Sequence, residues 1–268
     1  MFCDVDYHMH SCFSDGDLTP EELVDRYAAN RYEEIAITDH DRIEGSMAAV
    51  AYAAGRPIRV VPGVELTSSD EDHNIIHMLG YHFRYDDREL NRTLREVSMW
   101  RARRNDALLT ALREMGIYVT IDELLAVNEG RFIGKPTIAE VMVAKGYVKS
   151  VEEAFQTVFR RDEIRAVPKQ MIATEKAVDL IHGAGGIAVL AHPMEIRRRG
   201  EKLSDFRNRF ETVFRRVIRH GIDGMECYHP SATLLQAEEL RTLARKNNLI
   251  ITKGSDFHSD KARRQYEN

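Results

Sequence analysis

Cysteine is scarce in this sequence of 268 residues, which has only Cys3, Cys12 and Cys227. Three scattered cysteines are too few for a disulfide framework or for a zinc site made of cysteines. Long hydrophobic runs are lacking too, because no apolar stretch approaches the roughly 18 residues that a membrane span needs. The first residues, MFCDVDYHMH, contain neither a basic start nor an apolar segment, so we expect no secretory signal. We therefore expect a cytoplasmic protein that binds no membrane.

An excess of positive charge is also absent. The 38 Lys and Arg residues stand against 43 Asp and Glu residues, which gives a formal net charge of −5. This balance argues against stable binding of duplex nucleic acid, although a local basic patch can still bind phosphate. The hydrophobic fraction of 43% and the charged fraction of 30% are typical of a folded globular chain. The length fits one large domain, or one domain that carries a sizeable insertion.

What the sequence does contain is a series of short apolar runs rich in Ile and Val. Their length and β-branched content favour buried strands over helices. Between several of them lie helix starts, because Thr19, Thr120 and Ser150 each precede acidic residues in the pattern of an N-terminal cap. Strands that alternate with helices predict a mostly parallel α/β sheet, and seven strands suggest a barrel or a distorted relative of one. The predicted strands cover residues 5–8, 35–38, 58–66, 75–81, 187–191, 222–227 and 249–252.

One long segment breaks this alternation. Between residues 86 and 168 the apolar pattern is helical throughout, and no strand is predicted. We therefore predict a barrel domain formed by residues 1–85 and 169–268. Residues 86–168 are predicted to be a helical subdomain inserted into that barrel.

The placement of the histidines is the most informative feature of the sequence. Six of the eleven follow or lie within predicted strands, namely His8, His10, His40, His77, His192 and His258. The carboxyl ends of parallel strands converge on one face, so these imidazoles are expected at a single site. Imidazole and carboxylate ligands together suit zinc, manganese or iron. Because the candidate ligands exceed the three or four of one zinc ion, we predict several ions and a bridging carboxylate, for which Glu65 is the natural candidate.

Six motifs, in chain order, resemble the polymerase-and-histidinol-phosphatase (PHP) superfamily. They are DYHMHS at residues 6–11, SDG at 14–16, TDH at 38–40, GVE at 63–65, AHP at 191–193 and GSDFH at 254–258. The resemblance spans nearly the whole chain. It implies the fold of that family, a distorted seven-stranded β/α barrel, and its trinuclear metal centre.

The resemblance also implies how nine ligands are shared among three divalent ions of manganese, zinc or iron. The first ion would be bound by His8, His10, Glu65 and Asp256, the second by Glu65, His77 and His192, and the third by Asp15, His40 and His258. Among these ligands, Glu65, Asp15 and His192 are expected to take part in catalysis.

The remaining histidines are assigned no role in the centre. His73 and His82 lie near the fourth predicted strand, but His77 fits the family pattern better than either. His182, His220 and His229 have no ligand context in the sequence, so we expect them to be ordinary helix or loop histidines.

Within the superfamily, the segment SDGDLTP at residues 14–20 and the helical insertion resemble the branch of nucleotide phosphoesterases. That branch contains nucleoside 3′,5′-bisphosphate phosphatases and a 5′-to-3′ exoribonuclease. The resemblance therefore implies hydrolysis of phosphate esters of a nucleotide or a short oligonucleotide, with a metal-bound hydroxide as the nucleophile. Arg101 and Arg104 share a helix face, and Lys135 lies in the segment GKPTIA, so these three residues are expected to bind a second phosphate.

Three other functions are weighed against this one. Histidinol-phosphate phosphatases resemble this chain in length and are the main alternative. Amidohydrolases also begin with His-x-His, but they commonly use a bridging lysine where this chain has Glu65. A non-catalytic PHP scaffold would have lost ligands, and all nine positions carry suitable residues here. The oligomeric state and the proton donor to the leaving group are left open by the sequence.

Overall fold

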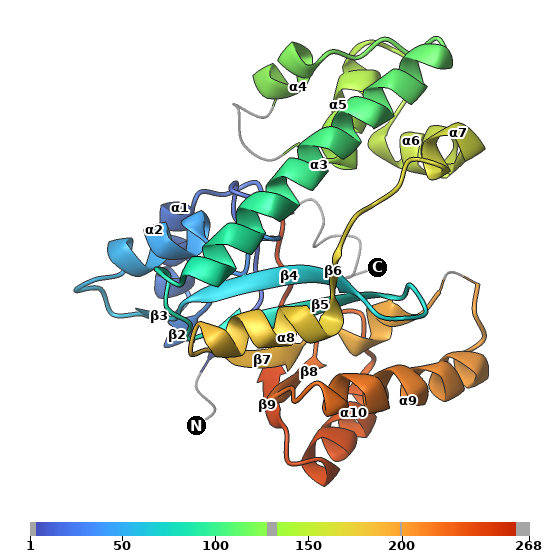
Figure 1. Ribbon diagram of the computed structural model, residues 1–268. Coiled ribbons are helices and arrows are strands. Elements are labelled where there is room, and N and C mark those ends of the chain that lie inside the picture. Colours follow the sequence, from blue (N-terminus) through green and yellow to red (C-terminus); the bar gives the residue numbers. More distant parts are fainter. Residues whose placement is uncertain (1–3, 128–132, 199, 261–268) are drawn as a thin grey trace. The chain divides into compact units, whose positions relative to one another are not determined.

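A computed structural model describes residues 4–127, 133–198 and 200–260 of the chain (Figure 1). It contains two compact units, one of residues 1–94 and 171–268 and one of residues 95–170. Residues 1–3, 128–132, 199 and 261–268, which the predicted domain ranges include, lie outside the described residues. No helix in the described part of the chain is long and apolar enough to cross a membrane.

The first unit starts with three short parallel strands in the order β1-β2-β3. Helix α1 begins at the predicted place, where Thr19 N–H donates to the Glu22 carboxylate at 2.8 Å and Thr19 Oγ1 accepts Glu22 N–H. Leu23 and Tyr27 of α1 then share an apolar cluster with Ile35 of β2. The elements are β1 Val5–Asp6, α1 Pro20–Ala29, β2 Glu34–Ile35, α2 Glu44–Tyr52 and β3 Arg59–Val60.

The second sheet has six strands in the order β6-β4-β5-β7-β8-β9. Strand β5 runs antiparallel to both of its neighbours, whereas the other neighbouring pairs are parallel. Five of the seven pairs among the described strands are parallel, so the prediction of a mostly parallel sheet holds, with β5 as the exception. The turn of residues 70–74 is too short for a crossover, and the Asp70 carboxylate closes it by accepting Asn74 N–H at 2.9 Å. The strands are β4 Gly63–Ser69, β5 Ile75–Tyr81, β6 Ile172–Ala173, β7 Ile187–Leu190, β8 Gly224–Tyr228 and β9 Ile250–Lys253.

The division into strands differs from the seven predicted runs. The predicted strand 58–66 is divided into β3 and β4, and Pro62, which has no N–H to donate, lies at the break. Strand β6 has two residues, which is too short for a periodic pattern to predict. Helix α8 packs against β4, β5 and β7, and α10 packs against β8 and β9. The remaining elements of this unit are α8 Thr174–Gly183, η2 Pro193–Ile196, α9 Leu203–Arg219 and α10 Leu234–Lys246.

Backbone bridges join the two sheets just beyond the ends of their short strands. Met9 pairs with Phe257, which follows β9, and His40 pairs with Glu65 of β4. At the first bridge, His10 N–H donates to Phe257 O at 2.9 Å. These links bring the segments that follow β1 and β2 beside β9 and β4, within one mixed α/β fold.

The regular elements of the second unit are all helices in its described residues, as the pattern between residues 86 and 168 predicts. Thr120 and Ser150 cap helices as predicted, since Thr120 N–H donates to Glu123 at 2.9 Å and Ser150 Oγ accepts Glu153 N–H at 3.1 Å. The unit has its own core, which includes Leu108, Leu112, Leu124, Ile138 and Met142. Its helices are α3 Arg88–Glu114, which begins in the first unit, α4 Ile121–Val127, α5 Lys135–Ala144, α6 Val151–Gln156, η1 Val158–Arg160 and α7 Asp162–Arg165.

Candidate metal centre

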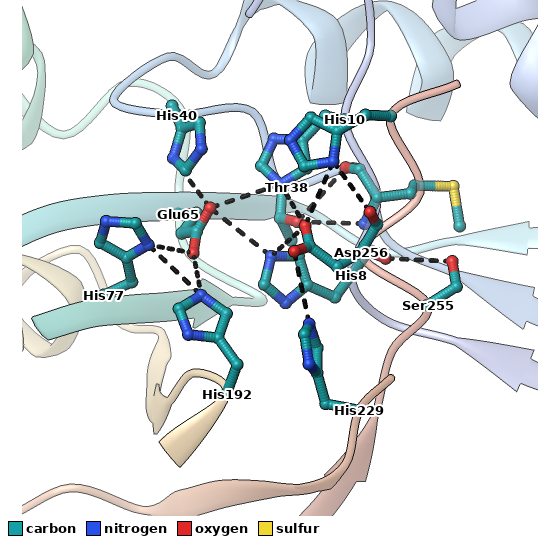
Figure 2. Close-up of polar contacts among 12 residues, drawn as sticks. His8, His10, Thr38, His40, Glu65, His77, His192, His229, Ser255 and Asp256 are labelled. Atoms are coloured by element: carbon teal, nitrogen blue, oxygen red, sulfur yellow. Dashed lines mark hydrogen bonds and ion pairs between the residues drawn. The ribbon is translucent and has the colours of Figure 1, made fainter. Parts of the chain in front are cut away.

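The carboxylate of Glu65 lies among the histidines of the predicted centre (Figure 2). Glu65 is a buried residue of β4. Its Oε1 lies 2.8 Å from Nδ1 of His77 on β5 and 2.9 Å from Nε2 of His192, which follows β7. His77 Nδ1 and His192 Nε2 are themselves 3.3 Å apart. The structure thus brings together the three residues that the resemblance assigns to the second ion.

The other oxygen of Glu65 faces the two histidines that follow β1. Oε2 lies 3.5 Å from Nε2 of His8 and 3.4 Å from Nε2 of His10. Asp256 faces the same two nitrogens, with its Oδ1 3.0 Å from His10 Nε2 and 3.4 Å from His8 Nε2. The four residues implied for the first ion therefore meet at one point.

The residues implied for the third ion are more loosely grouped. Asp15 Oδ1 lies 3.3 Å from His258 Nε2, and Asp15 Oδ2 lies 3.9 Å from His40 Nε2. His40 also reaches Glu65, with its Nδ1 2.8 Å from Oε2. The side chains of Asp15 and His258 are 26% and 28% exposed, whereas Glu65 is 1% exposed. This part of the centre is the most accessible to solvent.

Several polar atoms of the centre are buried without a hydrogen-bond partner among the described residues. Leaving a buried polar atom unpaired is costly, so a cluster of such atoms that face one another fits bound cations. Imidazole and carboxylate are also the donors that zinc, manganese and iron accept. The atoms include His8 Nε2, Asp15 Oδ1 and His192 Nδ1.

A chain of hydrogen bonds orients His10 as a ligand. Ser14 Oγ–H donates to the buried carboxylate of Asp39 at 2.6 Å, and Ser11 N–H donates to the same carboxylate at 2.7 Å. Because the Ser14 proton points to Asp39, Ser14 Oγ accepts from Nδ1 of His10, which lies 3.3 Å away. The proton of a neutral His10 is therefore on Nδ1, and the lone pair of Nε2 faces Glu65 and Asp256.

Two residues of the centre have backbone conformations that side chains disfavour. The φ angle is 22° at His192 and 50° at Asp256. Both conformations are held by hydrogen bonds, from His192 N–H to Glu226 Oε2 at 2.8 Å and from Asp256 N–H to His8 O at 2.8 Å. Strain of this kind persists where the surrounding structure requires it, typically at functional sites.

The centre carries buried charges of both signs. Burial opposes ionisation of Glu65, but the surrounding histidines, His40 first, hold its pKa well below the ordinary value. Burial likewise opposes protonation of His40, yet Glu65 and Asp15 raise its pKa to about 10. Asp15 similarly raises the pKa of His258 to about 9 against the effect of burial. Burial, together with His258 and His40, lowers the pKa of His10 to about 4. Protons on His40 and His258 thus compete with any cation for the same nitrogens.

Sequence comparison supports the motif resemblance. The PHP domain family matches residues 6–227 of the chain. The chain belongs to the PHP family. This PHP protein is 30% identical over 259 residues to the 5′-3′ exoribonuclease Rnm of Escherichia coli (strain K12), an alignment that covers 94% of this chain and 84% of the relative. It is also 30% identical over 256 residues to the 3′,5′-nucleoside bisphosphate phosphatase of Chromobacterium violaceum, covering 95% and 87% of the two chains.

Solved structures share the fold of this PHP protein. A structure described as a metal-dependent phosphoesterase from Bifidobacterium adolescentis has a TM-score of 0.80 and 28% identity, covering 95% of this chain and 87% of that one. A structure described as an amidohydrolase from Chromobacterium violaceum, with bound sulfate and no metal, has a TM-score of 0.84 and 30% identity, covering 97% and 89%.

Two buried residues of the PHP site are missed by the sequence interpretation. Glu226 of β8 lies 3.1 Å from Nδ1 of His8, and His229 Nε2 lies 3.3 Å from Asp256 Oδ2. Figure 2 shows His229 pointing toward Asp256, so the expectation that His229 is an ordinary loop histidine is wrong. A signal was present for His229, because it follows a strand end as several of the other ligands do.

The three basic residues predicted to bind substrate lie in or at the edge of the helices of the second unit. Arg101 and Arg104 are in α3, and Lys135 is the first residue of α5. Burial, and then the charge of Arg101, lowers the pKa of Arg104, while burial and the charge of Arg104 lower the pKa of Lys135. Arg104 Nε is buried without a hydrogen-bond partner among the described residues. Lys135 Nζ lies 5.2 Å from the ring centre of Phe159. The unit therefore holds a cluster of positive charges that repel one another.

Proposed function

We propose that this PHP protein is a metal-dependent phosphoesterase that hydrolyses phosphate esters of nucleotides. The observation that supports this most is the grouping of the nine candidate ligands at one site, with buried nitrogen and oxygen atoms that lack partners among the described residues. Two relatives that align with most of the chain are named as a 5′-3′ exoribonuclease and a 3′,5′-nucleoside bisphosphate phosphatase. A nucleoside bisphosphate and a short 5′-phosphorylated oligonucleotide are accordingly the proposed substrates.

The proposed centre binds three divalent ions of manganese, zinc or iron, with the ligands divided as the resemblance implies. Divalent ions bound there would lower the pKa of a water and offset the negative charge of a phosphate. Glu65 joins the groups for the first and second ions, because its two oxygens face different histidines. Asp15 belongs to the group for the third ion, and His192 belongs to the group for the second ion. We propose that Glu65, Asp15 and His192 are all needed for catalysis.

We infer that the two sheets form the distorted barrel of the PHP fold. The bridges Met9–Phe257 and His40–Glu65 support a continuous ring of strands, in which β3 and β4 act as one bent strand. We also propose that residues 86–168 are an inserted subdomain, a range that overlaps most of the compact unit of residues 95–170.

The substrate's second phosphate is proposed to bind the cluster of Arg101, Arg104 and Lys135. The metal centre can neutralise the scissile phosphate, but a nucleoside 3′,5′-bisphosphate carries a second phosphate. That second phosphate needs positively charged side chains to bind it. A buried Arg104 Nε without a partner among the described residues, next to two further cations, suits a phosphate that accepts charge-assisted hydrogen bonds. Histidinol phosphate lacks this second anion, so the cluster favours the nucleotide over that alternative.

One experiment tests the proposal against its competitors. The purified protein is analysed for bound metal and then assayed on a nucleoside 3′,5′-bisphosphate, a short 5′-phosphorylated RNA, histidinol phosphate and a panel of amides. We expect several metal ions per chain and release of phosphate or nucleotide from the first two substrates. Preference for histidinol phosphate, or hydrolysis of amides alone, would contradict the proposed substrate. A chain that binds no metal and has no activity would favour a non-catalytic PHP scaffold.

A further inference from the structure

Glu226 connects two proposed ligands that come from different strands. It lies in β8 and its side chain is 1% exposed. Its oxygens Oε1 and Oε2 lie 3.1 Å and 3.2 Å from Nδ1 of His8, whose side chain is fully buried. Oε2 also accepts the backbone N–H of His192 at 2.8 Å. One carboxylate thus holds the imidazole of His8 and the strained backbone of His192 at the same time.

The chemistry of these contacts fixes where the proton of His8 lies. A carboxylate can only accept hydrogen bonds, so His8 Nδ1 must carry the proton that it shares with Glu226. When the imidazole is neutral, as in a metal ligand, Nε2 then carries the lone pair. That atom is buried without a hydrogen-bond partner among the described residues and faces Glu65 and Asp256.

The chain packs closely against Glu226 and His8 at Gly254. A β-carbon at Gly254, which follows β9, would lie 2.2 Å from His8 Cβ and 2.5 Å from Glu226 Oε1. Only glycine therefore permits the strand end to pass this close to the pair. The backbone as well as the carboxylate holds His8 in place.

We propose that Glu226 is a positioning residue that keeps Nε2 of His8 available for the first ion and sets the backbone of His192 for the second. This inference rests on the proposed metal centre. Supporting carboxylates of this kind fix the tautomer and orientation of metal-binding histidines, and losing them typically weakens metal affinity about 10- to 100-fold.

A competing interpretation is that His8, Glu226 and His229 bind a further ion, since their donor atoms lie close together. The backbone N–H of Ser231 donates to Nδ1 of His229 at 3.0 Å, and a backbone N–H cannot accept. The proton of a neutral His229 is therefore on Nε2, and this nitrogen lies 3.3 Å from Asp256 Oδ2. A protonated nitrogen cannot bind metal, so the geometry favours a positioning role for this group as well.

The substitution Glu226→Gln tests the proposal with almost no change in shape. The His192 N–H can only donate, so the amide oxygen of glutamine must stay with it. The amide NH₂ then faces His8 Nδ1, which has to accept, and the proton of His8 moves to Nε2. Zinc titrations of the metal-free variant, read by chelator competition and elemental analysis, should show affinity for one ion about 10- to 100-fold weaker than in the unmodified chain. Glu239→Gln, at an exposed residue of α10 that pairs with Arg207, is the matched control and should bind zinc normally.

The outcomes separate this inference from the proposed function. Equal zinc affinity in the Glu226→Gln and Glu239→Gln proteins would overturn the inference while leaving the metal centre intact. If the unmodified chain binds four zinc ions and the Glu226→Gln protein binds three, a further ion site at His8, Glu226 and His229 is favoured instead. An unmodified chain that binds neither zinc nor manganese nor iron would overturn the proposed function and this inference with it. If Glu226→Gln does not fold, imidazole ¹⁵N spectra of the zinc-loaded unmodified chain decide, because a proton on His8 Nδ1 supports the inference and one on Nε2 overturns it.

Discussion

His40 and Glu65 meet twice, once through their backbones and once through their side chains. Their backbones form the bridge that joins the segment after β2 to β4, and His40 Nδ1 lies 2.8 Å from Glu65 Oε2. The contact that links the two sheets therefore also shapes the metal centre. Because the backbone bridge does not depend on the side chains, changes to the Glu65 carboxylate should affect the centre before they affect the fold.

The substitution Glu65→Gln removes the charge of the central carboxylate and keeps its size. We expect the circular dichroism spectrum to be retained, metal content to fall and phosphoesterase activity to drop at least about 100-fold. The exposed residue Glu71, in the turn before β5, supplies the control Glu71→Gln, which should behave as the unmodified chain. Normal metal content and near-normal turnover in the Glu65→Gln protein would contradict the central role of this carboxylate.

Asp15 belongs to the most exposed part of the centre and shares few contacts with the other groups. We expect Asp15→Ala to lower the metal content by about one ion per chain, because the other groups keep their own ligands. Elemental analysis after gel filtration measures this. Asp17→Ala, an exposed position two residues later, should leave the content unchanged. Full metal content in the Asp15→Ala protein would mean that Asp15 serves only the turn of residues 12–15, in which it lies.

Much of the metal centre is accessible to sequence reasoning because many of its residues follow strands. His8, His192 and Asp256 each come just after an apolar run, and a strand end is where a polar side chain can reach a shared site. Glu226 was missed because it lies inside its strand, where an alternating or apolar pattern says nothing about a single buried carboxylate. His229 was missed because its environment depends on Asp256, which is distant in the sequence and comes close only through the pairing of β8 with β9.

The direction of β5 could not be predicted from its composition. An apolar run is equally compatible with a parallel and an antiparallel neighbour, and only the length of the connection decides. The turn of residues 70–74 contains that information, whereas the β-branched content of the flanking runs does not. The spatial grouping of the basic residues in the second unit is also only partly predictable from the sequence. Helix periodicity places Arg101 and Arg104 on one face, but only the structure shows that Lys135 lies near Arg104.

The metal-free protein should be most stable near neutral pH. His40 and His258 have pKa values raised to about 10 and about 9, above the ordinary value near 6.5, so the stability they contribute is complete below pH 6.5 and is lost as the pH rises through those values. His10 has a pKa lowered to about 4, so its contribution is present above pH 6.5 and is lost as the pH falls toward 4.

Thermal melting of the metal-free chain between pH 4 and pH 10 measures this dependence. We expect the melting temperature to fall on both sides of neutrality. Bound metal replaces the protons on His40 and His258, so the alkaline decline should shrink when zinc is present. A metal-free melting temperature that rises steadily from pH 6.5 to pH 10 would contradict the charge arrangement of the centre.

The basic cluster of the second unit should determine which phosphate esters are good substrates. A charge-assisted contact to phosphate contributes about 1.5 to 3 kcal/mol, which corresponds to roughly ten- to a hundredfold in kcat/KM. Lys135→Met or Arg104→Met should therefore weaken hydrolysis of a nucleoside 3′,5′-bisphosphate by that factor and leave a simple monophosphate ester almost unaffected. Arg103→Met, at an exposed position on the same helix as Arg104, is the matched control and should change neither rate. Equal losses on both substrates would show that the cluster supports the fold or the metal centre, and unchanged rates on both would favour histidinol phosphate as the substrate.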